Sequence, residues 1–353
     1  MRRLFRAAIS LSFLLLIIAL PAGAQSFDII PVADGVYAAI GRNGVFSNAA
    51  IIINRDDVLV VDSHLRPSWA QDLIREIKKL TDKPVRYVVN THWHPDHVQG
   101  NQAYVNVFGP TVEYLAQHSA REDMIHKGIP SIQESLQTMP AEIAKDEKSL
   151  ADGKDDKGQP LSSDSRAALQ KSIAGDKSYL EELKTMQVTL PTITFERSLI
   201  LHKPNDRAIQ VLYFGKGHTR GDVVVFLPKE KILVSGDLLT GGLPFMRDAY
   251  PVEWVATLES VQKLDWETCI PGHGGVQKGK QQIGNLIAFM KDMVAAVKDA
   301  VAKGQSLEAT KKSVDLTSHM LGFAVYKTKE QFQRAAESAV ERCWNELSGK
   351  IVD

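Results

Sequence analysis

Four side chains that commonly bind metal ions fall within six residues of this chain, directly after a largely apolar run. They are His92, His94, Asp96 and His97, and the run before them is 85–89. Such a run predicts a buried strand, so the four side chains lie on the loop that leaves the end of this strand. Imidazoles and a carboxylate crowded this closely repel or desolvate one another unless a cation holds them. The pattern therefore predicts a metal-binding loop.

Three later motifs supply more side chains of the same kind. His218 lies in the stretch Gly217–Asp222, Asp237 follows Ser235-Gly236, and His273 follows Pro271-Gly272. None of the seven positions is cysteine, and imidazole with carboxylate suits zinc, with iron or manganese compatible with the same donors. Together the seven side chains can enclose two metal ions.

These motifs resemble those of the metallo-β-lactamase superfamily, whose H-x-H-x-D-H signature is matched without a substitution in residues 92–97. The resemblance preserves the family's motif order and covers roughly residues 28–290. It implies that one metal is held by His92, His94 and His218, and a second by Asp96, His97 and His273, with the Asp237 carboxylate as a bridge. Asp62 follows the apolar run 58–61 and matches the family's first motif, which implies that it orients the histidine loop.

The order of predicted elements indicates an α/β fold in two similar halves. Strands are expected over 29–40, 49–53, 58–61 and 105–108 and again within 192–236, with helices over 67–80 and 252–302. A sandwich of two sheets with helices outside follows, and the resemblance implies the same four-layer αββα fold. We expect the hydrolase domain to span 25–303, with a charged helical insert at about 111–188, broken by a glycine-bearing loop at 153–160. A C-terminal helical extension covers 304–353.

The first 24 residues have the pattern of an export signal. Three arginines precede the apolar stretch 7–20, and the small residues Ala22, Gly23 and Ala24 follow it. The apolar stretch is shorter than the roughly 18 residues that a membrane span needs. We therefore expect a signal peptide cleaved after Ala24, by the Sec or the Tat route, and a periplasmic or secreted protein without a membrane anchor.

Composition and charge limit the partners. The chain has 42 basic and 42 acidic residues and no concentrated basic patch, which argues against nucleic-acid binding. A small-molecule substrate is the expected partner, and the sequence is compatible with a homo-oligomer. Two cysteines occur, and Cys269 sits in an apolar stretch that predicts a buried strand position rather than a disulfide with Cys343.

The ligand set predicts a dinuclear-zinc hydrolase. Water activated between two ions would attack the carbonyl of a small ester, thioester, lactone or β-lactam, with Asp96 and Asp237 as the catalytic carboxylates. The bridging Asp237 resembles the glyoxalase II and lactonase branches, because the best-known β-lactamases have cysteine or serine at that place. Export favours β-lactam hydrolysis instead, since antibiotics are met in the periplasm.

Two other functions remain open from the sequence. A persulfide dioxygenase resembles the same motif but uses one iron, held by the equivalents of His92, His218 and Asp237. A non-catalytic metal-binding module would keep the donors without turnover.

The loops around the motifs suggest what else faces the site. Phe46, Phe245 and Met246 are expected to face substrate, because they lie in glycine-bearing loops with apolar tips. His64 either faces the site or packs in the core. The insert serves dimerisation or acts as a lid.

Overall fold

A computed structural model describes residues 25–202 and 207–351 of the chain. The expected signal peptide, residues 1–24, lies outside the described residues. Within the part that is described, no helix has both the length and the apolar character needed to cross a bilayer.

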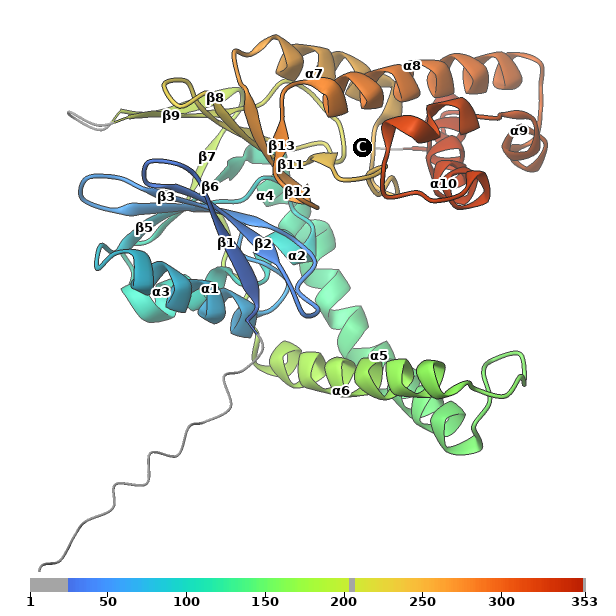
Figure 1. Cartoon of the computed structure of the whole chain (residues 1–353), viewed down its shortest axis with the longest axis horizontal. Coiled ribbons are helices and arrows are strands. Elements are labelled where there is room, and N and C mark those ends of the chain that lie inside the picture. The colour runs from blue at the N-terminus through green and yellow to red at the C-terminus, as the bar shows by residue number, and fades with distance from the viewer. Residues whose placement is uncertain (1–24, 203–206, 352–353) are drawn as a thin grey trace, which may run out of the picture.

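Two β-sheets pack face to face, and helices cover the outer face of each (Figure 1). The first sheet is antiparallel from β1 to β4 and parallel from β4 to β7. Its strands, in spatial order, are β1 (Phe27–Ala33), β2 (Val36–Gly41), β3 (Ala49–Ile53), β4 (Val58–Val61), β5 (Val85–Val89), β6 (Glu113–Gln117) and β7 (Ile193–Phe195).

The second sheet is antiparallel except where β11 and β12 run side by side in the same direction. Its strands, in chain order, are β8 (Ser198–His202), β9 (Ala208–Leu212), β10 (Val224–Leu227), β11 (Ile232–Thr240), β12 (Thr268–His273) and β13 (Gln277–Lys278). In space they are arranged in the order β13-β12-β11-β10-β9-β8.

Strand β4 shows why the fold has four layers. All four of its residues are apolar and buried, and side chains alternate between the two faces of a strand. Val58 and Val60 pack outward against the helices, whereas Leu59 and Val61 pack inward between the two sheets. A continuous apolar strand of this kind needs cover on both faces. A third cluster packs helices against the outer face of the second sheet and completes the αββα order.

The helices lie in three groups. Those on the first sheet or beside the histidine loop are α1 (Pro67–Leu80), α2 (Pro95–Val98) and α3 (Asn101–Phe108). Those of the insert are α4 (His118–Asp123), the π-helix η1 (Met124–Gly128), α5 (Ile129–Asp152) and α6 (Ser163–Thr185). Those of the second half are α7 (Pro251–Lys263), α8 (Gln281–Ala302), α9 (Leu307–Ser313), the 3₁₀ helix η2 (Thr317–Gly322) and α10 (Lys329–Leu347).

Most expected elements are present, but three expectations were wrong. The expected helix over 252–302 is two helices, α7 and α8, with strands β12 and β13 between them, because residues 268–270 pair with β11. Residues 105–108 belong to helix α3 rather than a strand, because Asn101 and Tyr104, three residues apart, both face the core and Gly109, with φ of 81°, ends the helix. The expected insert also begins too early, since residues 113–117 form β6, which pairs with both β5 and β7. The helical insert proper is therefore 118–185.

Helices α5 and α6 form a long hairpin that extends away from the body (Figure 1). The hairpin has its own small apolar core around Ile143, Ile173 and Leu180. It is tied to the body through Glu182, whose carboxylate accepts hydrogen bonds from the backbone N–H and the hydroxyl of Ser68 at 2.9 and 2.8 Å. These contacts fix α6 against the beginning of α1.

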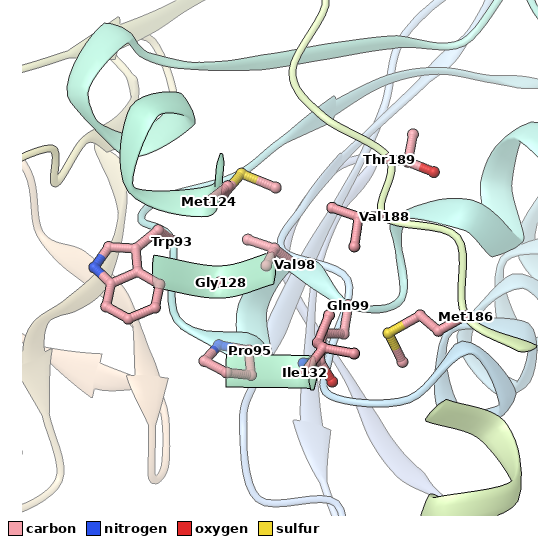
Figure 2. A pocket seen from close by; sticks show the side chains of 10 residues that line it. All are labelled: Trp93, Pro95, Val98, Gln99, Met124, Gly128, Ile132, Met186, Val188 and Thr189. Carbon is pink, nitrogen blue, oxygen red and sulfur yellow. The ribbon is translucent and has the colours of Figure 1, made fainter. Parts of the chain in front are cut away.

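The base of the insert packs against the back of the histidine loop. Figure 2 shows the small apolar pocket at this junction, which is lined by Trp93 and Val98 of the histidine loop and α2, and by Met124, Ile132 and Met186 of the insert and the segment after it. The pocket has a volume of about 20 Å³, which is close to the minimum for one water molecule. Insert and histidine loop are therefore in nearly continuous contact.

The C-terminal extension packs onto the second half. Phe332 of α10 is fully buried and meets Phe289 of α8 edge to face at 5.9 Å between ring centroids. Replacing Phe332 with alanine should lower the free energy of unfolding by about 3–5 kcal/mol, because the large cavity cannot fully collapse. Leu321→Ala, at a side chain that is 91% exposed, should change it by less than about 0.5 kcal/mol. Chemical denaturation of both variants measures this, and equal stabilities would contradict the packing described.

Candidate metal centre

The seven expected ligands converge at one edge of the sandwich, where both sheets end. His92, His94, Asp96 and His97 lie on the loop after β5 and in the short helix α2. His218 lies in the turn between β9 and β10, while Asp237 and His273 belong to β11 and β12. Their donor atoms form three overlapping groups in which the atoms lie within 4.8 Å of one another: His92, His94 and His218; His92, His97 and Asp237; Asp96, His97 and His273.

The first of these groups is a buried set of imidazoles. His218 Nε2 lies 2.8 Å from His94 Nδ1, and the His92 ring is 4.8 Å from each of the other two rings. Burial lowers the pKa of His92 well below its usual value and the pKa of His218 to about 3. Both rings are therefore neutral at physiological pH, and a neutral imidazole offers a lone pair to a cation.

The group of Asp96, His97 and His273 lies nearer to solvent. The Asp96 Oδ2 atom is 3.2 Å from His97 Nε2 and 3.3 Å from His273 Nε2, and the His273 side chain is 29% exposed. Burial opposes ionisation of Asp96, but His97 and His273 outweigh it and hold its pKa well below the usual range. The anionic carboxylate thus faces two imidazoles at the mouth of the site.

Asp237 lies between the group of His92, His94 and His218 and the group of Asp96, His97 and His273. Its Oδ2 is 3.5 Å from His218 Nε2 and 3.2 Å from His273 Nε2, while Oδ1 is 3.5 Å from His97 Nε2. Burial opposes ionisation here too, but the surrounding histidines hold the pKa of Asp237 below its usual range. One buried carboxylate therefore faces ligands of both groups, as a bridge between two ions requires.

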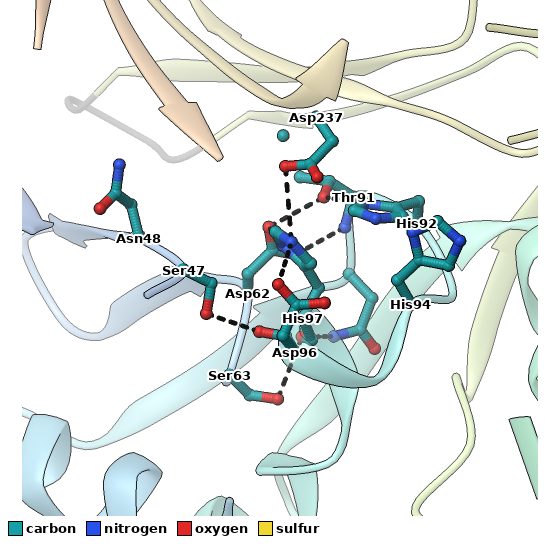
Figure 3. A network of polar contacts seen from close by, with 12 residues as sticks. Ser47, Asn48, Asp62, Ser63, Thr91, His92, His94, Asp96, His97 and Asp237 are labelled. Atoms are coloured by element: carbon teal, nitrogen blue, oxygen red, sulfur yellow. Dashed lines mark hydrogen bonds and ion pairs between the residues drawn. The ribbon is translucent and has the colours of Figure 1, made fainter. Parts of the chain in front are cut away.

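Asp62 orients the histidine loop as expected. One carboxylate oxygen accepts from the Thr91 N–H, and the other accepts from the Thr91 hydroxyl and from His97 Nδ1, each at 2.8 Å (Figure 3). These bonds direct His97 Nε2 away from Asp62 and toward Asp96 and Asp237. Asp62 adopts a left-handed backbone conformation, with φ of 65°, which aspartate tolerates better than most residues.

A loop before β3 fixes the other side of the site, and sequence reasoning singled out only its Phe46. His273 Nδ1 contacts the Phe46 carbonyl oxygen at 2.9 Å, so its Nε2 faces the carboxylates. The Ser47 hydroxyl donates to the Asp96 carbonyl at 2.7 Å. Asn48 donates from its amide to the carbonyls of Pro271 and Gly274, at 2.9 and 2.7 Å. Loop residues 46–48 therefore hold the His273 turn against the Asp96 loop.

Asp248 is a further site residue that sequence reasoning missed. Its Oδ2 lies 3.1 Å from His94 Nε2, which leaves His94 Nδ1 facing His218. Burial opposes ionisation of Asp248, but the hydrogen bond to His94 keeps its pKa below the usual range. Asp248 is 154 residues from His94 in the chain, so only the folded structure brings the pair together.

The arrangement fits a metal better than it fits a closed hydrogen-bond network. His92 Nε2, His97 Nε2 and Asp237 Oδ1 are buried and have no hydrogen-bond partner. Buried polar atoms without partners are costly, and clustered ones indicate a missing ligand. The outer nitrogens of His94, His97 and His273 each contact a protein oxygen, an arrangement typical of metal-binding histidines. The donors therefore suit one or more cations.

The three expected substrate-facing residues differ in position. Phe46 and Phe245 are exposed and flank the site, with ring centroids 6.1 Å from His273 and 6.4 Å from His94. The expectation for Met246 was wrong, because its side chain is 1% exposed and packs in the core of the second half.

The remaining histidines lie outside the three groups of donors. His64 is buried, contacts the Ser47 hydroxyl at 3.1 Å and packs on Phe27. His319 contacts Asp292, His126 contacts Glu122, and His118 and His202 are exposed. Cys269 and Cys343 are buried and free, and Cys269 occupies β12 as expected.

Comparison with known proteins gives a family and several relatives. Residues 42–273 match the family model described as the metallo-beta-lactamase superfamily. A linear primary-alkylsulfatase of a Pseudomonas species is 23% identical over 288 residues, which cover 77% of this chain and 50% of that protein. A type 2 metallo-beta-lactamase of Bacillus cereus is 25% identical over 236 residues, which cover 65% of this chain and 68% of that protein. The chain thus spans about half the length of the alkylsulfatase.

Solved structures confirm the expected fold. The metallo-beta-lactamase of Pontibacter korlensis superposes with a TM-score of 0.53 at 17% identity, covering 75% of this chain and 99% of that one. At this identity the likeness shows the sandwich fold alone. Together with the family match and the donor cluster, it supports a metal-dependent hydrolase.

Gly272 provides a test of the Asp237 position. A Cβ atom at residue 272 would lie 1.9 Å from Asp237 Oδ1, so Gly272→Ala must displace the carboxylate. We expect this variant to retain less than half of the metal that the unsubstituted protein keeps after dialysis, as measured by elemental analysis. Gly275→Ala, where no atom lies within 4 Å of the new methyl group, is the matched control and should retain it all. Full retention of metal by Gly272→Ala would contradict the assignment of Asp237 as a ligand in its present position.

Proposed function

The chain belongs to the metallo-beta-lactamase superfamily, and we propose that it is an exported dinuclear-zinc hydrolase of small esters, thioesters, lactones or β-lactams. The observation that carries the proposal is the position of Asp237, whose two oxygens face His97 on one side and His218 on the other. A site for one ion would use only one side of this carboxylate. With the six other donors, Asp237 completes a set of seven, which is enough for two ions.

In this proposal one ion would be held by His92, His94 and His218 and the other by Asp96, His97 and His273, with Asp237 within reach of both sets. Bound zinc ions would supply an activated water as nucleophile and would polarise the substrate carbonyl. Zinc is favoured because the donors are imidazole and carboxylate without sulfur.

The chain's own residues would perform the remaining steps. Asp62, Asp248 and the Phe46 carbonyl keep three imidazoles in their orientations. Asp96 lies at the solvent-facing mouth, where its carboxylate would accept a proton from the attacking water and return it to the leaving group. Phe46 and Phe245 border the mouth and would contact the substrate.

The compartment is part of the proposal. The predicted signal over residues 1–24 favours a periplasmic or secreted protein, with a small molecule as its partner and no nucleic acid. The substrate is a carbonyl compound in this account because Asp237 resembles the bridging residue of lactonases and glyoxalase II.

A second candidate is hydrolysis of an alkyl sulfate ester. It is favoured by the Pseudomonas relative, a linear primary-alkylsulfatase that aligns with 77% of this chain. A sulfate ester has no carbonyl carbon, so a substrate panel distinguishes the two candidates directly.

The test uses zinc-loaded protein with a chromogenic β-lactam, a lactone, a thioester and an octyl sulfate, with His218→Ala as the matched variant. We expect at least one carbonyl substrate to be hydrolysed, with a rate at least about a thousandfold lower in His218→Ala, because a first-metal ligand is lost. Circular dichroism should be the same for both proteins. Turnover of the sulfate alone would select the second candidate. Inertness toward all four substrates at full zinc occupancy, or equal turnover by metal-free His218→Ala, would contradict the proposal.

A further inference from the structure

A groove of about 380 Å³ opens beside the metal centre. Asp237 and His273 are among the residues that line it. Its walls include Leu243, Pro244 and Phe245, from the loop after β11, and Val325 from the C-terminal extension. The extension therefore contributes a side chain to a hollow that is continuous with the donors.

We propose that this groove binds an uncharged, apolar substituent of the substrate, such as an alkyl or acyl chain, and that Val325 helps to determine which substituents fit. The inference rests on the proposed function, which places the reacting group at the metal centre. It adds a substrate class and assigns a role to the C-terminal extension.

The segment that carries Val325 is anchored on both sides. Phe323 is buried and packs against Phe289 at 6.1 Å between ring centroids. The Tyr326 ring meets Phe332 edge to face at 5.3 Å, and the Tyr326 hydroxyl accepts a hydrogen bond of 3.2 Å from the Leu243 N–H. Val325 lies between these anchors with its side chain 56% exposed. The packing of its neighbours therefore fixes the position of Val325 against the loop after β11.

The chemistry of the walls selects the substituent. Phe245 and Val325 are both large apolar residues with more than half of their surface exposed. Apart from the donors Asp237 and His273, the lining residues are uncharged: Thr240, Gly241, Gly242, Leu243, Pro244, Phe245, Gly274 and Val325. The nearby Arg247 guanidinium lies over the Phe245 ring, and its Nε atom is 3.8 Å from the Asp248 carboxylate. Apolar groups gain free energy by leaving water for such walls, whereas a carboxylate finds no cation among the lining residues.

Continuity with the donors identifies the occupant as the substrate itself. A molecule whose reacting group lies at Asp237 and His273 must place its remainder nearby, and the groove is the hollow that these two residues line. Glycines keep it open: a Cβ atom at Gly242 would lie 3.0 Å from the Val325 side chain and narrow the passage.

The test compares two metal-binding probes that share a headgroup, acetohydroxamate and octanohydroxamate, by calorimetry on the zinc-loaded full protein. We expect octanohydroxamate to bind at least tenfold more tightly, because its chain leaves water for the groove. In Val325→Glu the advantage should fall to less than threefold, while acetohydroxamate binds as before. Leu321→Glu, at an exposed residue of the same extension, is the matched control and should keep the full advantage.

The outcomes distinguish failure of the groove assignment from failure of the proposed function. Equal binding of the two probes at full metal occupancy, or an advantage that survives Val325→Glu, would overturn the groove assignment and leave the proposed function standing. Failure of the protein to retain zinc would overturn the proposed function and this inference with it. Thermal unfolding of Val325→Glu checks that the extension remains folded.

Discussion

Two carboxylates, Asp96 and Asp237, must be stabilised as anions where two β-sheets meet, and much of the local structure serves that requirement. Burial alone would favour their protonated forms, but the surrounding imidazoles reverse the direction of both pKa shifts. The imidazoles are in turn held by Asp62, by Asp248 and by the Phe46 carbonyl. Each sheet supplies part of the set, so the apolar contact between the sheets is what assembles the centre.

The local sequence pattern was sufficient to predict the bounds of several helices and strands. The bounds of β3, β4, α1 and β5 match the expected ranges, because the strands are short, largely apolar runs and α1 carries its apolar residues at helical spacing. The pattern was misleading at 105–108, where apolar residues near a helix end resemble a short strand. It was also misleading at β6, which was expected to be part of the helical insert. The end residues of this strand, Glu113 and Gln117, are polar, and its strand form depends on pairing with β5 and β7.

The site shows the same division. The seven donors and Asp62 lie in short motifs whose residue types already restrict the chemistry, so the sequence located them. Asp248, Ser47, Asn48 and Val325 lie in no such motif, and they reach the site only through contacts between distant parts of the chain. Met246 was misplaced because the sequence cannot tell which side of a loop faces the core. Linear motifs thus reveal ligands, whereas the residues that orient ligands and shape the groove require the fold.

The central claim is that this centre holds two metal ions with a carboxylate between them. Elemental analysis of the purified protein tests it most directly. The measured quantity is the number of metal ions bound per chain after loosely bound ions have been removed. The account predicts two zinc ions per chain. One iron per chain, with oxygen consumed during turnover, would contradict it and favour the dioxygenase chemistry that three of the same donors could support.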